Sequence, residues 1–550
     1  MKKSQLVFIA IIVMLLASVL TVPLTVGAAQ CNPIPAQPIP LGPLDAAAWG
    51  RYVGGPATPN PVPHVAAPQN PYMAPNGMSN MHNDSYMTDA YEVGGPLGLA
   101  TRQMRSASFP MELVVTTTFD SYGRIVAVRQ GADGQPHLLL MDPDSLATLA
   151  FYDLPGRPYP PDQDAIPLTE DPSGGVYFYL DNKDNVVVTT NDYRLLVIKL
   201  PPLASPCVGF KVIEQYDLSG NLATPPEPPA GKLTRDKMGP ALPDWGGGYY
   251  WFSTRYGSVG VLDQQDGKVR SLILEGEQIE NSPAVGEDGF YVVTDYAMYR
   301  FSVDLNGNPV MDWRTTYDRG LVRRPGMITQ GSGTTPTLLG DLVAIADNAD
   351  PLNVLFLRRD NGQKVVEVPV FAAGTSCTEN SLIGVQHLDG SYSVIVENNY
   401  GYVSYANTAF GMTTVGGVAR VDAVLDASSP TGYSGHIQWT STQISPTCVP
   451  KMSLANGLVY LYTKPVNPFP PPPPPAPYYP PPQGYPPMYL VARWYFTAVD
   501  FGTGATVYSV MTGEGVMYNN NWAPITLGPD GRTVYVGCLG GLVSMRDPAT

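Results

Sequence analysis

A short signal recurs along the second half of this chain and limits what the chain can fold into. A small residue, often proline, precedes an apolar pair, a glycine turn and a strand-like run. The signal is clear in "NSPAVGEDGFYVVTDYAMYRFS" from Asn281 and in "TTPTLLGDLVAIADNADPLNVLFLRR" from Thr334, and Pro283 and Pro336 are about 50 residues apart. Repeats of about this length with three or four strands are typical of β-propeller blades.

The same signal returns in later units, and weaker units precede it. Further units begin at Glu379, Ile444 and Trp522, and weaker ones at Met111, Gly174 and Gly247. No segment shows a long helical period. We therefore predict an all-β propeller of about eight four-stranded blades, with seven blades or a two-domain β-sandwich as alternatives. Because the chain ends soon after "GGLVSMRDPAT", we expect an N-terminal strand to complete the last blade and remove an open edge.

The composition supports this fold class and limits the kinds of partner that the protein can bind. Hydrophobic residues make up 44% and charged residues 14% of the chain, with 55 Gly, 58 Pro and 33 Tyr. Many turn formers and aromatics with few charges suit an all-β exported protein. The net charge of −15 argues against nucleic acid or an anionic membrane surface as a partner, and it is compatible with divalent cations.

The N-terminal segment predicts export. Lys2 and Lys3 precede an apolar run and the small residues Gly27 to Ala29, so residues 1–29 read as a signal peptide of a secreted or periplasmic protein. The apolar run is also long enough for an uncleaved membrane anchor that faces outside. We expect a proline-rich arm over residues 30–75, the propeller over 76–550 and a proline-rich loop insertion over 466–489. The five cysteines include no CxxC pair, and their pairing stays open.

One turn resembles a known repeat family. "TAVDFGTGATVYSV" contains Ala498, Asp500, Thr503 and Gly504 in the A-x-D-x-x-T-G pattern of pyrroloquinoline-quinone-type (PQQ-like) propeller repeats, and "LDQQDGKVRS" matches it in part. The chain also resembles a group of secreted bacterial proteins of this propeller type. The resemblance implies the fold and raises a PQQ-dependent oxidoreductase as a third reading of function. Such an enzyme is expected to carry adjacent cysteines beside the quinone, which this sequence lacks.

Polar clusters flank the predicted inner strands. In a propeller, the loop before the innermost strand and the loop after the second strand lie on the same face, so we expect these clusters to ring the mouth of the channel. Carboxylate and amide oxygens are the ligands that calcium prefers. The candidate metal ligands are Glu379, Asn380, Asn281, Asp347, Glu397 and Asn399. The alternative is that these side chains bind only water and cap their own turns.

A second candidate is the segment "SNMHNDSYMTDAY", where His82 stands near two acidic residues, Asp84 and Asp89. A histidine beside carboxylates can act as a general base, although such a residue more often holds a loop by hydrogen bonds. If the segment crosses the propeller face, His82 is the predicted catalytic residue. The leading hypothesis is a binding or scaffold propeller whose face takes calcium, a glycan, another small polar ligand or a cell-surface protein. The alternative function is that of a metal-dependent hydrolase, because the polar pattern resembles that of the lactonase and gluconolactonase propellers.

Overall fold

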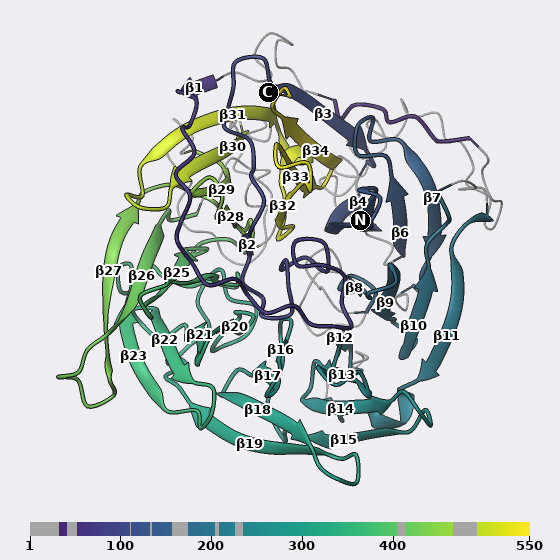
Figure 1. Cartoon of the computed structure of the whole chain (residues 1–550), viewed down its shortest axis with the longest axis vertical. Helices are drawn as coiled ribbons and strands as arrows, with labels where there is room; N and C mark the ends of the chain where they lie inside the picture. Colours follow the sequence, from purple (N-terminus) through teal and green to yellow (C-terminus); the bar gives the residue numbers. More distant parts are fainter. Residues whose placement is uncertain are drawn as a thin grey trace, which may run out of the picture.

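The computed structural model describes residues 32–40, 52–110, 112–131, 135–156, 174–203, 208–225, 235–403, 414–465 and 492–549. These residues form eight β-sheets around a central axis, as Figure 1 shows. The prediction of an all-β propeller of about eight four-stranded blades is therefore confirmed. Helix in the described part is limited to short 3-10 turns such as η4 (Ser219–Asn221) and η6 (Val516–Tyr518).

The blades are numbered in chain order, and their strands are given from the axis outward. Blade 1 consists of β4 (Glu112–Phe119), β5 (Ile125–Gly131), β6 (Pro136–Met141) and β7 (Thr148–Asp153), and blade 2 of β8 (Phe178–Leu180), β9 (Asn185–Thr189), β10 (Arg194–Lys199) and β11 (Lys211–Asp217). Blade 3 consists of β12 (Met238–Pro243), β13 (Tyr249–Thr254), β14 (Ser258–Asp263) and β15 (Val269–Ile273), and blade 4 of β16 (Ala284–Gly286), β17 (Gly289–Val293), β18 (Ala297–Val303) and β19 (Pro309–Thr316). Blade 5 consists of β20 (Thr337–Leu339), β21 (Leu342–Ala346), β22 (Asn353–Arg358) and β23 (Lys364–Pro369), and blade 6 of β24 (Ile383–Gln386), β25 (Tyr392–Glu397), β26 (Val418–Leu425) and β27 (Tyr433–Ser441). Blade 7 consists of β28 (Lys451–Ser453), β29 (Leu458–Thr463), β30 (Arg493–Asp500) and β31 (Thr506–Glu514), and blade 8 of β32 (Ile525–Leu527), β33 (Thr533–Cys538), β34 (Gly541–Arg546) and β3 (Gln103–Ser108).

Burial falls from the axis outward, and this explains the apolar pattern of the sequence. Every residue of the second strand β21 is buried, whereas most of the outer strand β11 is exposed or half-buried. Neighbouring blades pack face to face, so a middle strand is covered on both faces and reads as a continuous apolar run. The hydrophobic core accordingly lies between blades, as in the cluster that joins β21 and β22 to β25 and β26.

The N-terminal strand β3 closes the ring. It pairs antiparallel with β34, from Gln103 opposite Arg546 to Ser108 opposite Gly541, and forms the outer strand of blade 8. The prediction that an N-terminal strand completes the last blade is confirmed. Such closure ties the two ends of the ring together and leaves no open blade face.

Two tryptophans lock outer strands onto the next blade. Trp439 of β27 donates its indole N–H to the Phe501 carbonyl at 2.8 Å, in the turn that carries the A-x-D-x-x-T-G pattern. Trp313 of β19 donates in the same way to the Arg359 carbonyl of blade 5, also at 2.8 Å. The pattern seen in the sequence is therefore one half of an interblade contact, and the tryptophan belongs to the preceding blade.

The segment Ser79–Tyr91, here called the plug, fills the channel, and all its residues are buried. Figure 1 shows the N-terminal trace crossing the ring and entering its centre, where β2 (Ala90–Tyr91) pairs parallel with β28. Along the plug, successive carbonyls accept hydrogen bonds from innermost strands. The bonds run from Leu180 to Ser79, Val285 to Ser85, Leu338 to Tyr86, Gly384 to Thr88, Met452 to Asp89 and Leu454 to Tyr91, at 2.7–3.0 Å. The plug thus pairs the exposed inner edges of blades 2, 4, 5, 6 and 7.

The described parts of the predicted arm contact outer strands first and then cross to inner strands, where Val65 bridges Gln386 of β24 and the Ala74 N–H donates to the Leu180 carbonyl of β8. Ile34 forms a bridge with Thr148 of β7, and β1 (Tyr52–Gly54) adds to the outer edge of β31. The predicted signal peptide, residues 1–29, and the predicted insertion, 466–489, lie outside the described residues. In the part of the chain that the structure describes, no helix has the length and apolarity needed to cross a membrane.

Candidate functional site

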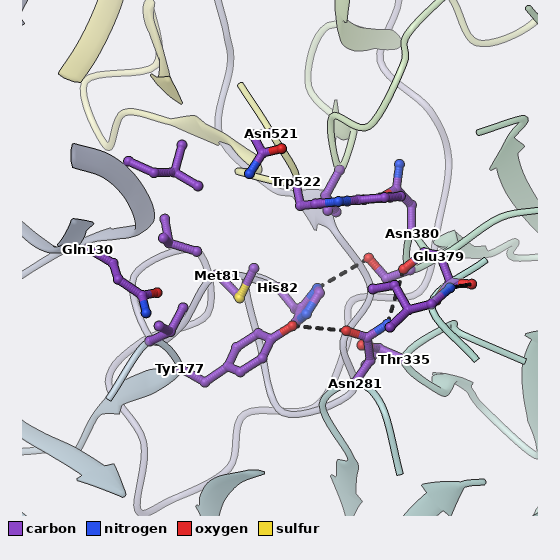
Figure 2. A pocket seen from close by; sticks show the side chains of 16 residues that line it. Met81, His82, Gln130, Tyr177, Asn281, Thr335, Glu379, Asn380, Asn521 and Trp522 are labelled. Carbon is purple, nitrogen blue, oxygen red and sulfur yellow. Dashed lines mark hydrogen bonds between the residues drawn. The ribbon is translucent and has the colours of Figure 1, made fainter. Parts of the chain in front are cut away.

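The loops that lead into the innermost strands meet at one end of the channel. Asn281 precedes β16, Thr335 precedes β20, and Glu379 and Asn380 precede β24. All four contribute to a cavity on the axis whose volume, with its mouth, is about 600 Å³. Figure 2 shows them together with His82, which comes from the plug.

Sixteen residues line this cavity from blades far apart in sequence. The apolar part of the lining consists of Met81, Leu113, Val115, Val176, Ile328 and Val449. Tyr177 and Trp522 add aromatic rings, and the remaining residues are polar. An apolar lining with a few convergent polar groups is typical of small-molecule sites.

Glu379 is buried at the cavity wall, and its carboxyl group has few hydrogen-bond partners. Its side chain accepts one hydrogen bond, from the Ile328 backbone N–H at 3.1 Å, and the residue is 5% exposed. Burial, followed by the nearby Glu280 carboxylate, raises the pKa of Glu379 well above its usual range. Burial therefore favours the neutral carboxyl, which can donate a hydrogen bond.

The two polar clusters of the sequence stretch Glu379–Asn399 are neighbours within blade 6. Asn399 Oδ1 accepts from the Glu379 backbone N–H at 2.9 Å, and Asn380 Nδ2 donates to Glu397 Oε2 at 2.7 Å. Asn380 Nδ2 also donates to the Cys448 carbonyl of the loop before blade 7, at 2.9 Å. These bonds fix the loop that carries Glu379 and leave Asn380 Oδ1 without a partner among the described residues.

Three of the six predicted metal ligands lie behind the cavity rather than in its lining. Asp347 accepts bonds from the backbone of Ala349 and Asn353, at 2.8 and 2.9 Å, and so caps its own turn. Asn399 and Glu397 accept hydrogen bonds from the loop that carries Glu379 and Asn380. Burial raises the pKa of Glu397 to about 8. The structure brings Asn281, Glu379 and Asn380 to the cavity, and it places Asp347, Glu397 and Asn399 outside its lining.

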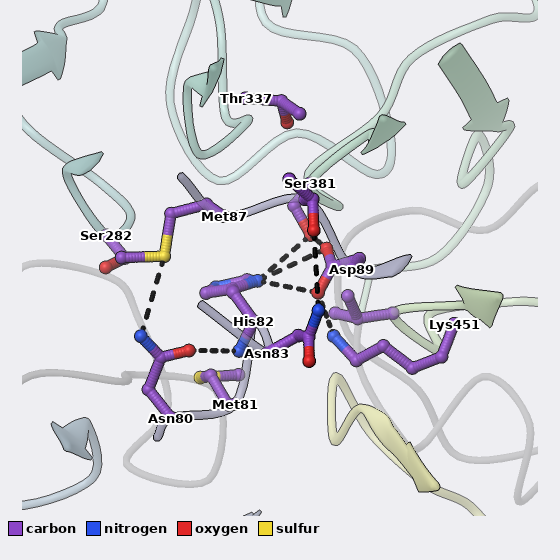
Figure 3. A network of polar contacts seen from close by, with 12 residues as sticks. Asn80, Met81, His82, Asn83, Met87, Asp89, Ser282, Thr337, Ser381 and Lys451 are labelled. Atoms are coloured by element: carbon purple, nitrogen blue, oxygen red, sulfur yellow. Dashed lines mark hydrogen bonds and ion pairs between the residues drawn. The ribbon is translucent and has the colours of Figure 1, made fainter. Parts of the chain in front are cut away.

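His82 belongs to a buried polar network that joins the plug to blades 6 and 7 (Figure 3). Its Nδ1 lies 3.2 Å from Asp89 Oδ1 and 3.2 Å from Ser381 Oγ. The Lys451 ammonium pairs with the same Asp89 carboxylate, and both side chains are fully buried. Burial would raise the pKa of Asp89, but Lys451 and His82 together hold it below its usual range. Burial also lowers the pKa of His82, which is therefore a neutral imidazole at pH 7.

Four polar atoms of the cavity lining have no hydrogen-bond partner among the described residues. They are Gln130 Nε2, His82 Nε2, Glu379 Oε2 and Asn380 Oδ1. Each residue is at most 5% exposed. Burying a polar group without a partner costs roughly 1–3 kcal/mol, so four such atoms around one cavity call for partners supplied by water or by a ligand.

Sequence reasoning missed several residues of this site. Gln130, at the end of the second strand of blade 1, and Tyr177, before blade 2, lie in weak repeat units. Trp522 follows Asn521 in the loop before β32, and both have positive φ angles, 71° and 39°. A tryptophan in this backbone region is strained, and such strain gathers at functional sites. The sequence signal was the run "NNNW", which interrupts the regular blade pattern.

The cavity residues fit neither a calcium ion nor PQQ well. Calcium takes six to eight oxygens, but the unpartnered oxygens in the described lining are those of Glu379 and Asn380. No group of three or more His, Cys, Asp or Glu side chains that could hold a metal ion occurs among the described residues. PQQ is a tricarboxylate, and the described lining contains no lysine or arginine. The described cysteines Cys377, Cys448 and Cys538 are free and buried.

Fold and site together define an eight-bladed propeller whose channel is plugged from within and hollowed at one end. No protein-family model and no curated protein matches the sequence. Among solved structures, the quinohemoprotein alcohol dehydrogenase from Comamonas testosteroni is similar, with 12% identity, 88% of this chain and 82% of that chain covered, and a TM-score of 0.48. BamB from Moraxella catarrhalis has 13% identity, coverages of 75% and 95%, and a TM-score of 0.38. The C-terminal WD40 domain of Sif2 has 9% identity, coverages of 81% and 99%, and a TM-score of 0.44. PQQ-type and WD40 propellers thus both occur among similar structures, and neither likeness bears on activity.

Proposed function

We propose that this protein is a binding propeller that takes a small, neutral, polyhydroxylated ligand, such as a sugar unit of a glycan, in the axial cavity. The observation that carries the proposal is the set of four buried, unpartnered polar atoms around one cavity. With Glu379 neutral, the cavity offers a carboxylic O–H and the Gln130 amide as donors and the Asn380 carbonyl as an acceptor. A ligand with several hydroxyl groups can satisfy both kinds of atom at once.

The aromatic residues of the lining support the same ligand class. Trp522 is half-buried at the cavity, and its ring stands at 85° to that of Tyr402, with the ring centres 5.4 Å apart. Packed aromatic rings give contact area at low entropic cost. Calcium remains the alternative ligand at this mouth, and it would have to convert Glu379 to its charged form on binding.

The proposal includes the setting predicted from the N-terminal segment. We place the protein in the periplasm or outside the cell, where its ligand is a glycan or a glycan-bearing surface protein. The low proportion of charged residues and the many tyrosines support that setting.

Thermal unfolding with named probes tests the proposal. Wild-type protein is heated alone and with glucose, galactose, xylose, calcium chloride or a chelator. A probe at a hundredfold over its dissociation constant should stabilise the folded state by about 2.7 kcal/mol. We expect at least one sugar to raise Tm and calcium to have no effect.

Two variants separate the ligand classes. Glu379→Gln keeps a donor at the cavity wall and removes the charge, so it should retain sugar binding, whereas calcium binding would be lost. Gln130→Met removes an unpartnered donor and should weaken sugar binding about tenfold, as expected for one hydrogen bond. Gln215→Met, on the exposed outer strand β11, is the matched control. A calcium-dependent rise in Tm that Glu379→Gln abolishes would replace the sugar by a cation.

A further inference from the structure

The imidazole of His82 is held as a general base would be. Its Nδ1 faces the Asp89 carboxylate at 3.2 Å, while its Nε2 has no partner among the described residues and the residue lines the axial cavity. A carboxylate at Nδ1 favours the tautomer with the proton on Nδ1, which leaves a lone pair on Nε2. Figure 2 draws His82 among Tyr177, Asn281 and Glu379 in the cavity.

The rest of the network fixes this arrangement. Ser381 contacts His82 Nδ1 and also donates to Asp89, and Lys451 neutralises the same carboxylate from β28 (Figure 3). The charged groups that act on the ring are Asp89 of the plug and Lys451 of β28. Glu379, in the loop before β24, lines the same cavity. Because no described hydroxyl or thiol bonds to Nε2, the base has no protein nucleophile to activate. Its proton must come from a water molecule or from the ligand.

We propose that the axial cavity hydrolyses a neutral ester or lactone of a polyhydroxylated compound, with His82 as the general base. The inference rests on the proposed function, because it requires that the cavity take such a ligand. His82, Glu379 and Gln130 are then catalytic residues, and Asp89, Ser381 and Lys451 are positioning residues.

The reaction balances without a metal or a redox partner. A water O–H bond breaks as His82 Nε2 takes the proton, and the water oxygen bonds to the carbonyl carbon, whose oxygen takes the electron pair and accepts from Gln130 Nε2. When the intermediate collapses, the bond from carbon to the leaving oxygen breaks, and that oxygen takes the proton of the Glu379 carboxyl. The imidazolium proton returns to Glu379 through water. One water is consumed, and one carboxylic acid and one alcohol form.

The test uses the purified full chain and two probes, glucono-δ-lactone and 4-nitrophenyl acetate, each measured against the uncatalysed rate. We expect turnover of at least one probe and a loss of about 100-fold or more in kcat/KM for His82→Gln, the usual share of a general base. His137→Gln is the matched control. His137 also pairs with a carboxylate through Nδ1, at 2.6 Å from Asp153, but it lies on β6 and not in the cavity lining.

A second measurement keeps the inference testable apart from activity. The nitrogen NMR spectrum of histidine-labelled protein, assigned with His82→Gln, should show Nδ1 protonated and Nε2 bare at pH 7. The double variant Asp89→Asn with Lys451→Met removes both charges of the buried pair, and it should lose this tautomer preference together with the rate. A protonated Nε2 in the wild type would overturn the role of His82.

The outcomes separate this inference from the proposed function. Sugar binding without turnover of either probe would overturn hydrolysis and leave the binding propeller in place. Equal turnover by wild type and His82→Gln would assign catalysis to another group. Loss of both binding and turnover in the wild type would overturn both proposals.

Discussion

At the scale of single residues, buried carboxyls define the pH response of this molecule. Glu397 is fully enclosed in blade 6, and its pKa is raised from 4.5 to about 8 by burial. Between these two values the folded protein therefore keeps a proton on Glu397 that the unfolded chain has released. Stability from this group is complete below about pH 4.5 and is lost as pH rises toward 8, by at most about 1.4 kcal/mol per pH unit.

Glu397→Gln is predicted to flatten this dependence. The glutamine oxygen still accepts the bond from Asn380 Nδ2, but the side chain no longer titrates. Urea unfolding at pH 5, 6, 7 and 8 should show a free energy of unfolding that falls less steeply than in the wild type. Glu275→Gln, at an exposed loop position after β15, serves as the control and should keep the wild-type slope. Identical slopes for wild type and Glu397→Gln would mean that Glu397 titrates alike in both states.

The candidate site was partly predictable at this scale. Glu379, Asn380 and Asn281 precede apolar strand starts, and a propeller brings such positions to one mouth, so the sequence sufficed to group them. His82 was found by its acidic neighbours, whereas its partner Lys451 lies far along the chain in an apolar stretch. Only the fold brings that lysine to Asp89, because the plug passes β28 in parallel.

At the scale of elements, the glycine turns under the two docked tryptophans are predicted to be hot spots of stability. Gly504 and Gly362 have φ angles of +73° and +74°, and an added Cβ would lie 2.6 Å from the ring of Trp439 or Trp313. Substitution by alanine should destabilise the fold by roughly 2–4 kcal/mol, through backbone strain and overpacking together.

Gly374→Ala is the control for these two variants. Gly374 has the same φ angle of +74°, but an added Cβ would meet nothing within 4 Å. Gly374→Ala should therefore lower the free energy of unfolding by only about 1 kcal/mol, from backbone strain alone. Denaturation midpoints of the three variants measure the difference, and equal losses would show that the tryptophan contact adds nothing.

The elements that sequence reasoning placed least well are the early inner strands. The unit expected from Gly247 begins at β13, the second strand of blade 3, because β12 has the sequence "MGPALP". Two prolines and a glycine hide this strand from any apolar pattern. An inner strand tolerates them because its neighbours and the channel contents fix its backbone, which local propensity does not reveal.

At the scale of the whole molecule, stability is predicted to depend on the β3–β34 closure. The Ser108 N–H donates outward to the Gln37 carbonyl, so by alternation the Ala107 N–H faces β34. Ala107→Pro removes that closing bond and should lower Tm by several degrees and reduce hydrogen-exchange protection in blades 1 and 8. Ser108→Pro removes only the outward bond and should be milder. If both variants behave alike, the closure does not limit stability.

The sequence was sufficient for the fold class and the closure and came within one of the blade number, because each follows from a repeated pattern and from the need to remove edges. It was not sufficient for the plug. The segment Ser79–Tyr91 is polar and has no strand period, and its burial depends on hydrogen bonds to five separate blades. No local pattern encodes contacts of that range, so the residues that shape the floor of the cavity emerge only from the assembled ring.

The plug and β3 both precede every blade that they contact, and this order has a consequence for synthesis. A ribosome releases these segments first, and their last partners, β28 and β34, emerge near the end. Throughout translation the growing chain therefore carries a polar segment without its channel and a strand without its neighbour. The ring can close only after the C-terminal blade has left the ribosome. A chain cut short there lacks β34, so β3 has no strand to pair with and the ring stays open. This architecture therefore lets the ring close only in chains that contain the C-terminal blade.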